Sequence, residues 1–336
     1  MPDRLTSRTP VVTPERILRD LVPPPHFAHV NFATYIPDPA QPTQMAAVAA
    51  LEAFSKSLGQ APPSRGWRRR AAPPESRAGV YLDGGFGVGK THLLAALWHT
   101  APEPRAYGTF VEFTNLVGVL GFTEAVARLS AYQLMCIDEF ELDDPGDTVL
   151  MSTLLGKLVD AGVRLAATSN TLPEKLGEER FAAEDFLREI QGLSAHFEVV
   201  RIDGEDYRHR GTPVAPEPWT DDALLASAES WSGSTLDTWS ELQAHLAGAH
   251  PSRYGAMLDG VTAVHIAGVR TLTDQVQALR TVVLIDRLYD RDIPIRSSGV
   301  PVDRLFSEEM LRGGYRKKYR RALSRVVALS RLGDTP

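Results

Sequence analysis

The chain has 336 residues, of which 43% are hydrophobic and 23% are charged, so it can bury the cores of about two soluble domains. Its formal net charge of −6 excludes a general positive field that would attract nucleic acid, although local basic patches stay possible. The single cysteine, Cys136, excludes an intrachain disulfide and a zinc site built from several cysteines. Because the net charge is negative, nucleic acid is not the expected partner.

The first part of the chain, residues 1–78, is expected to be a leader ahead of the core. Residues 1–25 lack the apolar run of a signal peptide, and their acidic residues are atypical of a transit peptide. No stretch approaches the roughly 18 apolar residues of a transmembrane helix, so the expected location is cytoplasmic. Residues 44–58 predict a helix, and the Arg65–Arg70 loop is expected to be solvated or to contact an anionic partner.

The strongest motif is the phosphate-binding pattern G-x-x-x-x-G-K-[ST], the P-loop, at residues 84–91, and the apolar stretch 79–82 precedes it. Its glycines let successive backbone N–H groups face phosphate oxygens, and the helix predicted after it adds partial positive charge. Lys90 is expected to reach the β- and γ-phosphates, and the Thr91 hydroxyl to hold Mg²⁺. The expected ATP-binding residues are Gly84, Gly85, Phe86, Gly87, Val88, Gly89, Lys90, Thr91 and His92.

Strand and helix signals alternate over residues 79–210, which predicts an α/β P-loop NTPase core of the AAA+ kind, a parallel sheet with helices on both faces. Residues 211–220 predict a linker. Residues 221–336 are expected to be a mixed, mainly helical region that completes the core and supplies a lid. The expected strands are 79–82, 105–113, 133–137, 163–168, 263–267 and 293–297, and the expected core helices are 123–129 and 147–160.

Two acids, Asp138 and Glu139, end a buried apolar strand one strand–helix unit after the P-loop. Ligands collect at the carboxyl ends of parallel strands, so Asp138 is expected to support Mg²⁺ and Glu139 to activate water as a general base. The next strand ends at Asn170, whose amide is expected to sense the γ-phosphate; capping a turn is the alternative. This order of motifs indicates ATP hydrolysis.

The resemblance of this motif order to AAA+ ATPases implies an arginine that contacts the γ-phosphate. Arg180 and Arg188 follow Asn170 and are the candidates for an arginine that contacts the γ-phosphate, with Arg180 preferred; either could be a plain surface arginine. The basic run 312–325 contains two tyrosines and has three interpretations. It could be a solvated helix face, supply a nucleotide-sensing arginine, or contact nucleic acid.

Several segments beyond the P-loop resemble one family over roughly residues 40–330. They are Pro42-Thr43-Gln44, Asp138-Glu139-Phe140, Ala167-Thr168-Ser169-Asn170, Leu284-Ile285-Asp286-Arg287-Leu288-Tyr289-Asp290 and Leu323-Ser324-Arg325. These segments resemble the ZapE-like, or Afg-like, AAA+ ATPases. The resemblance makes Asn170 the sensor 1 residue and implies that an arginine often comes from a neighbouring subunit of a homo-oligomer.

The resemblance also implies Mg²⁺-dependent ATP hydrolysis that remodels or regulates a protein partner, with FtsZ in bacterial cell division as the candidate. Mitochondrial relatives act in protein quality control, and the lack of transit-peptide features favours the bacterial role. Two alternatives stay open: a nucleic-acid-associated AAA+ protein such as a helicase loader, and a weakly hydrolysing nucleotide-binding scaffold. The acidic balance counts against the first, and the Asp138-Glu139 pair counts against the second.

Overall fold

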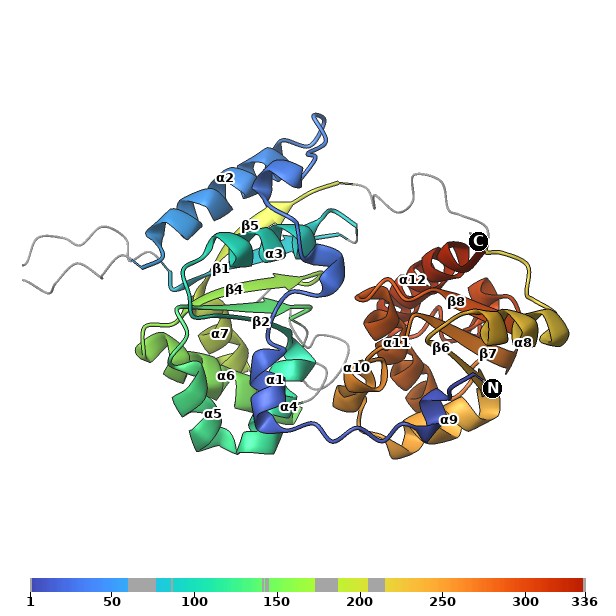
Figure 1. The fold of residues 1–336 in the computed structure, drawn as a ribbon. Helices are drawn as coiled ribbons and strands as arrows, with labels where there is room; N and C mark the ends of the chain where they lie inside the picture. The colour runs from blue at the N-terminus through green and yellow to red at the C-terminus, as the bar shows by residue number, and fades with distance from the viewer. Residues whose placement is uncertain are drawn as a thin grey trace, which may run out of the picture. The chain divides into compact units, whose positions relative to one another are not determined.

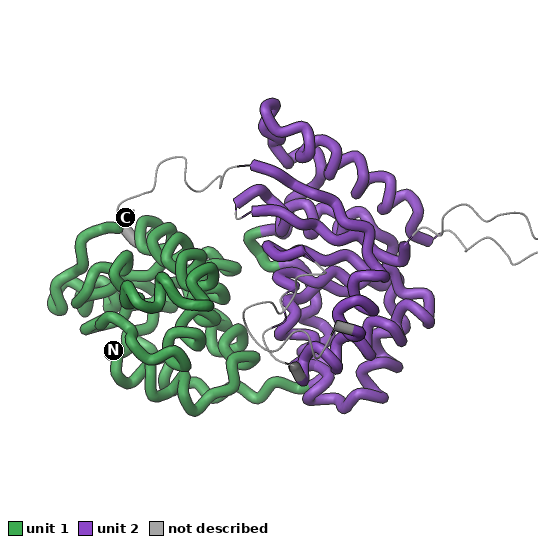
Figure 2. The backbone as a smooth tube through the Cα atoms, turned by 180° about the vertical axis from the view of Figure 1, so that it is seen from behind, with its two compact units in different colours: residues 1–13, 24–26, 210–336 green, residues 14–23, 27–209 purple. Residues whose placement is uncertain are grey.

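The computed structural model describes residues 2–59, 77–85, 87–140, 142, 145–172, 187–204 and 215–334. The chain forms two compact units (Figure 2). Unit 1 contains Met1–Thr13, Pro24–His26 and Arg210–Pro336, and unit 2 contains Pro14–Pro23 and Phe27–His209. The expected leader therefore contributes to both units, and the C-terminal region has a core of its own. The expected Arg65–Arg70 loop lies outside the described residues.

Unit 2 is built on a five-stranded sheet with the order β2-β3-β4-β1-β5, in which every neighbouring pair is parallel. The α/β fold with a parallel sheet is thereby confirmed. Strand β4 lies between β1 and β3. The carboxyl ends of these three strands, which lead into the P-loop, the acid pair and Asn170, therefore meet at one edge of the sheet. The strands are β1 Gly79–Gly84, β2 Arg105–Thr109, β3 Leu134–Asp138, β4 Arg164–Ser169 and β5 Phe197–Ile202.

Helices cover both faces of this sheet, as expected: α2 and α3 lie on one face, and α5, α6 and α7 on the other (Figure 1). The central strands are buried for this reason: every residue of β1 and β3 is buried, whereas the edge strand β5 keeps exposed residues. The predicted helices at 44–58, 123–129 and 147–160 are confirmed. The helices of unit 2 are α1 Pro14–Arg19, α2 Pro42–Ser57, α3 Lys90–Thr100, α4 Phe110–Leu120, α5 Phe122–Leu129, α6 Pro145–Asp160 and α7 Leu187–Ala195, with a 3₁₀ turn at Phe32–Thr34. A further 3₁₀ turn, Pro25–Phe27, has its first two residues assigned to unit 1.

The expected strand 105–113 is wrong in its second half, because the chain turns into α4 at Phe110. A capping box starts this helix: the Thr109 hydroxyl accepts the Glu112 N–H, and the Glu112 carboxylate accepts the Thr109 N–H at 2.7 Å. These reciprocal bonds satisfy backbone donors that a helix start leaves open. The apolar residues after Thr109 therefore follow a helical period and not that of a strand.

Helix α2 is fixed to the sheet by Gln44, which is buried. Its side-chain amide donates to the Asp203 carbonyl at 2.9 Å, and its side-chain oxygen accepts the Asp38 N–H at 2.7 Å. Ala47 and Leu51 on the same helix have no exposed surface. Gln44, which belongs to the segment that carries the resemblance ahead of the P-loop, therefore docks the leader helix beside the end of β5.

Unit 1 has a three-stranded parallel sheet with the order β6-β7-β8. The expected strands at 263–267 and 293–297 are confirmed as β7 Ala263–Val269 and β8 Ile295–Gly299, and β8 lies at the edge, as Pro294 indicates. Strand β6, Ser234–Thr238, is polar, which explains why the sequence pattern does not reveal it. The helices are α8 Asp221–Ser230, α9 Trp239–Gly248, α10 Tyr254–Met257, α11 Gln275–Tyr289 and α12 Arg316–Asp334, with 3₁₀ turns at Leu5–Ser7, Pro251–Arg253 and Val302–Arg304.

The N-terminal segment adds to the β6 edge of unit 1. The Asp3 carbonyl accepts the Leu236 N–H at 2.9 Å, and Leu5 is fully buried in the core. The buried Asp237 carboxylate accepts the Leu5 N–H at 2.9 Å and the Thr6 N–H at 3.1 Å. Charged acceptors make strong bonds to backbone donors, so Asp237 holds the segment in place.

One buried histidine makes unit 1 sensitive to acid. His265 on β7 is fully buried; its Nδ1 lies 3.2 Å from the Thr235 carbonyl and its Nε2 lies 2.8 Å from the Ser227 hydroxyl. Burial, helped by the nearby Arg296 charge, lowers the pKa of His265 to about 4. The imidazole is therefore neutral in the folded protein at pH 7, where Nδ1 donates and Nε2 accepts.

We expect acid to destabilise the fold through this residue. The unfolded chain binds a proton at His265 near pH 6.5, whereas the folded chain binds it only near pH 4. The contribution of neutral His265 to the free energy of unfolding is therefore fully present above pH 6.5. It is lost as the pH falls towards 4, and the total loss is roughly 3 kcal/mol. Urea unfolding measures the free energy of unfolding between pH 4 and 7. Its dependence on pH should be weaker in His265→Gln than in the parent, because glutamine keeps a donor and an acceptor but does not titrate. An unchanged slope would contradict this role.

Candidate functional site

The P-loop lies between β1 and α3, the strand–loop–helix context that the motif requires. Gly87 and Gly89 have φ angles of 66° and 85°, in the left-handed region that favours glycine. A Cβ atom at Gly89 would lie 2.5 Å from a ring carbon of Tyr35, so a side chain there would also collide with that ring. Both features restrict this position to glycine. Phe86 lies outside the described residues.

Lys90, the first residue of α3, points back over the loop. Its ammonium group donates to the carbonyls of Gly84 at 2.9 Å and Gly85 at 2.5 Å, and to the Asn170 side-chain oxygen at 2.7 Å. Asn170 follows directly after β4, which pairs with β1. The structure therefore brings together the P-loop lysine and the asparagine, which are distant in sequence.

Asp138, the last residue of β3, is buried and accepts hydrogen bonds on both carboxylate oxygens. Oδ1 accepts from the Thr91 hydroxyl at 3.3 Å and from the Thr168 hydroxyl. Oδ2 accepts from the Tyr107 hydroxyl at 3.0 Å. The two expected metal-binding residues, Thr91 and Asp138, thus lie side by side, and two partners that the sequence does not reveal hold the carboxylate.

Glu139 adopts a left-handed backbone conformation with φ of 53°. A non-glycine residue in this region costs on the order of 1 kcal/mol, so its surroundings must hold it there. The Glu139 N–H donates to Asp138 Oδ1 and to the Thr168 hydroxyl, both at 3.1 Å, and the Phe140 N–H donates to the Thr168 carbonyl at 2.7 Å. Phe140 is fully buried and packs its ring against Phe110 at 5.3 Å. This turn is therefore anchored on both sides of Glu139.

His92 contacts the leader segment, since its Nε2 lies 3.0 Å from the Thr34 hydroxyl and 3.2 Å from the Asn31 carbonyl. Burial lowers its pKa. Tyr35, which the sequence does not single out, donates to the Val88 carbonyl at 2.8 Å, and burial raises its pKa to about 12. Tyr35 and His92 thus attach residues 31–35 to the P-loop; no motif marks Tyr35, because the contact joins segments more than fifty positions apart.

The roles of Arg180 and Arg188 stay predictions, whereas the structure shows contacts of two arginines in the basic run. Arg180 lies outside the described residues, and Arg188 is exposed in the first turn of α7. In the basic C-terminal run, Arg321 and Arg325 point to Asp286 of α11; Arg321 lies 2.9 Å from its carboxylate. A solvated helix face is therefore wrong for these two arginines, although Arg320 in the same run is exposed.

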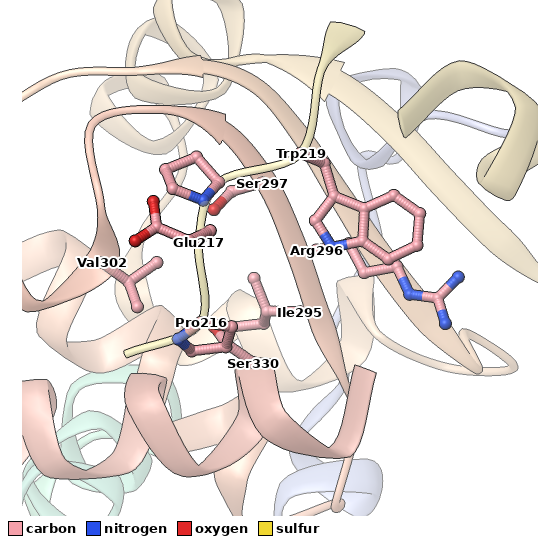
Figure 3. A pocket seen from close by; sticks show the side chains of 9 residues that line it. Pro216, Glu217, Trp219, Ile295, Arg296, Ser297, Val302 and Ser330 are labelled. Atoms are coloured by element: carbon pink, nitrogen blue, oxygen red, sulfur yellow. The ribbon is translucent and has the colours of Figure 1, made fainter. Parts of the chain in front are cut away.

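A separate small pocket lies in unit 1, beneath the strap of residues 216–219 and beside β8 and α12 (Figure 3). The Trp219 N–H donates to the Ser297 carbonyl at 2.9 Å, which closes the strap onto the strand. The pocket volume of about 10 Å³ is enough for one water molecule and far too small for a nucleotide. The P-loop edge of unit 2 is therefore the candidate functional site.

A family model described as AFG1-like ATPase matches residues 11–232 and 226–332. The chain belongs to the AFG1-like ATPase family. The match spans residues of both units, so AFG1-like family membership covers unit 1 as well as the P-loop core. The family resemblance expected from the sequence is confirmed.

Similar proteins share only part of their length with this AFG1-like chain. "Cell division protein ZapE" of Escherichia coli K12 is 33% identical over 144 residues, 39% of this chain and 38% of that protein. "Lactation elevated protein 1 homolog B" of Danio rerio is 24% identical over 166 residues, 43% and 33% of the two chains. AMPPCP-bound DnaA from Aquifex aeolicus is a solved structure at 13% identity and a TM-score of 0.39, covering 61% of this chain and 56% of that one.

Among the residues that the structure describes, no group of three or more His, Cys, Asp or Glu side chains could hold a metal ion by itself. Within the same residues, no helix has both the length and the apolar character needed to cross a membrane. The described side chains therefore form no preformed metal centre of this kind.

Proposed function

We propose that this chain binds ATP together with Mg²⁺ and hydrolyses the bond between the β- and γ-phosphates. The observation that carries the proposal is that the P-loop, the end of β3 and the end of β4 meet at one edge of the sheet. The Lys90 ammonium lies 2.7 Å from Asn170, and the Thr91 hydroxyl lies 3.3 Å from Asp138. Phosphoryl transfer depends mainly on positioning and electrostatics, which such an arrangement of cation, amide and carboxylate supplies.

Each residue would have a separate task. Backbone N–H groups of residues 84–91 and the start of α3 would bind phosphate oxygens, and Lys90 would neutralise their charge. Glu139 would accept a proton from the attacking water as general base. Asn170 would orient the γ-phosphate or the water by hydrogen bonding. Arg180 or Arg188 would contact the γ-phosphate, from the same chain or from a second copy in a homo-oligomer.

The donor set at this edge fits Mg²⁺. Thr91 offers a hydroxyl oxygen and Asp138 a carboxylate, and Mg²⁺ prefers oxygen ligands, several of which are usually waters and phosphates. When bound, the ion would neutralise charge on the β- and γ-phosphate oxygens. Thr91 would ligate it directly, and the buried Asp138 would orient its ligands.

The hydrolysis cycle would remodel or regulate a protein partner, and FtsZ is the first candidate. This part of the proposal rests on the similarity to the cell division protein ZapE, which covers 38% of that protein. The net charge of −6 does not favour a nucleic-acid partner. A helicase-loader role therefore remains the weaker alternative.

Steady-state ATP hydrolysis across a series of protein concentrations, with and without FtsZ, tests this function. We expect the specific rate to rise with protein concentration or with FtsZ, because an arginine from a second subunit, or a partner, would complete the site. Lys90→Ala protein, purified identically, sets the background rate. A flat rate at that background, together with tight ATP binding, would contradict hydrolysis and favour a nucleotide-binding scaffold.

A further inference from the structure

Thr168 lies on β4, two residues before Asn170, and it is 2% exposed. Its hydroxyl donates to Asp138 Oδ1 and accepts the Glu139 N–H at 3.1 Å. Its backbone carbonyl accepts the Phe140 N–H at 2.7 Å. One residue of β4 therefore binds three consecutive residues at the end of β3.

We propose that Thr168 is a positioning residue that joins the strand carrying Asn170 to both acids of the site. Its hydroxyl sets the orientation of the Asp138 carboxylate and holds the amide of Glu139. The inference rests on the proposed ATP hydrolysis and assigns to Thr168 a role that no sequence motif gives it. Thr168 does not touch nucleotide in this role; it acts through Asp138 and Glu139.

A purely local role for this hydroxyl does not fit its contacts. The neighbouring Ser169 hydroxyl accepts the Thr171 N–H at 3.1 Å, which is an ordinary turn contact two residues away. The Thr168 hydroxyl instead bonds residues 29 and 30 positions away, on an adjacent strand. Parallel strands already bond through their backbones, so the pairing of β3 with β4 does not require this hydroxyl.

The conformation of Glu139 supplies a second reason. Its φ of 53° is unfavourable for a residue with a side chain, and the donors on either side of its Cα both end on Thr168. On the other side of Asp138, the Tyr107 hydroxyl holds Oδ2 at 3.0 Å. Removing the Thr168 hydroxyl would leave Asp138 held by fewer bonds and Glu139 free to relax towards a less strained backbone.

The test compares Thr168→Val, which keeps the shape and removes the hydroxyl, with Thr168→Ser, which keeps the hydroxyl. We expect Thr168→Val to lower kcat for ATP about 10–100-fold and to raise the Mg²⁺ concentration that half-saturates binding of a fluorescent ATP analogue. Binding of that analogue at saturating Mg²⁺ should stay within about threefold of the parent, and Thr168→Ser should recover most of kcat. Thr153→Val, at an exposed helix threonine, is the matched control.

Parental kcat and Mg²⁺ dependence in Thr168→Val would overturn the inference, as would a Thr168→Ser protein as slow as Thr168→Val. If the valine variant does not fold, Thr168→Ala replaces it, with urea unfolding as the check. Failure of the proposed function is distinguishable: it would show as parental turnover in Glu139→Gln or as no turnover in the parent. In those cases the Mg²⁺ dependence of analogue binding still decides whether Thr168 positions Asp138.

Discussion

Glu139→Gln is expected to lower kcat for ATP hydrolysis at least about a hundredfold and to leave ATP affinity within about threefold of the parent. Glutamine keeps the size of the side chain but cannot accept a proton from water. The backbone bonds that hold this turn come from the Glu139 and Phe140 amides, so they survive the substitution. Single-turnover hydrolysis and equilibrium binding of a fluorescent ATP analogue measure the two quantities separately.

The control for this prediction is Glu198→Gln, the same chemical change at an exposed glutamate of β5 in the same sheet. It should hydrolyse ATP like the parent. Lys90→Ala should instead lose most nucleotide affinity, since we propose that its ammonium group neutralises the phosphates. Robust turnover by Glu139→Gln would remove Glu139 from the mechanism and leave water activation to another group.

Asp286→Asn is expected to destabilise the protein by about 3–5 kcal/mol. The Asp286 side chain on α11 bonds Arg321 at 2.9 Å and also bonds Arg325, and the two arginine side chains are only 8% and 14% exposed. Burial alone would raise the pKa of this carboxyl, but the two guanidinium groups lower it. Removing the charge leaves two buried cations without their shared anion. Urea unfolding at pH 7 measures the loss.

Asp303→Asn, at an exposed aspartate of unit 1, is the matched control and should change stability by less than about 0.5 kcal/mol. The triple variant Asp286→Leu, Arg321→Met and Arg325→Met should recover much of the stability, because apolar side chains can replace a buried ion pair. An Asp286→Asn protein as stable as the parent would show that solvent reaches this cluster, and the basic run would again be open to a surface role.

The P-loop could be predicted because its chemistry is contiguous. Residues 84–91 form one continuous pattern of glycines, a lysine and a threonine, with a strand signal before it and a helix signal after it. The acids Asp138 and Glu139 and the residue Asn170 could be predicted as strand-end side chains, since apolar strand signals precede both segments. The roles assigned to them remain predictions that the kinetic experiments above test.

One element had a local signal that the apolar pattern hid, and the others depended on contacts between distant residues. The apolar residues after Thr109 suit a strand or a helix, and the capping box with Glu112 decides for the helix. Strand β6 is too polar to be recognised, and it forms because β7 and the N-terminal segment pair with it. Arg321 and Arg325 look like part of a solvated run until the fold places Asp286 beside them.

The sequence by itself determined the fold class, the phosphate-binding loop and the family, because each depends on residues close together in the chain or on strand and helix periods. Only the tertiary structure decided which distant side chains meet. The strand order puts β4 between β1 and β3, so Asn170 reaches Lys90 while Thr168 binds Asp138 and the amide of Glu139. Strand order is a property of the packed sheet, since it depends on which strands pair once the chain has folded, and no local pattern encodes it.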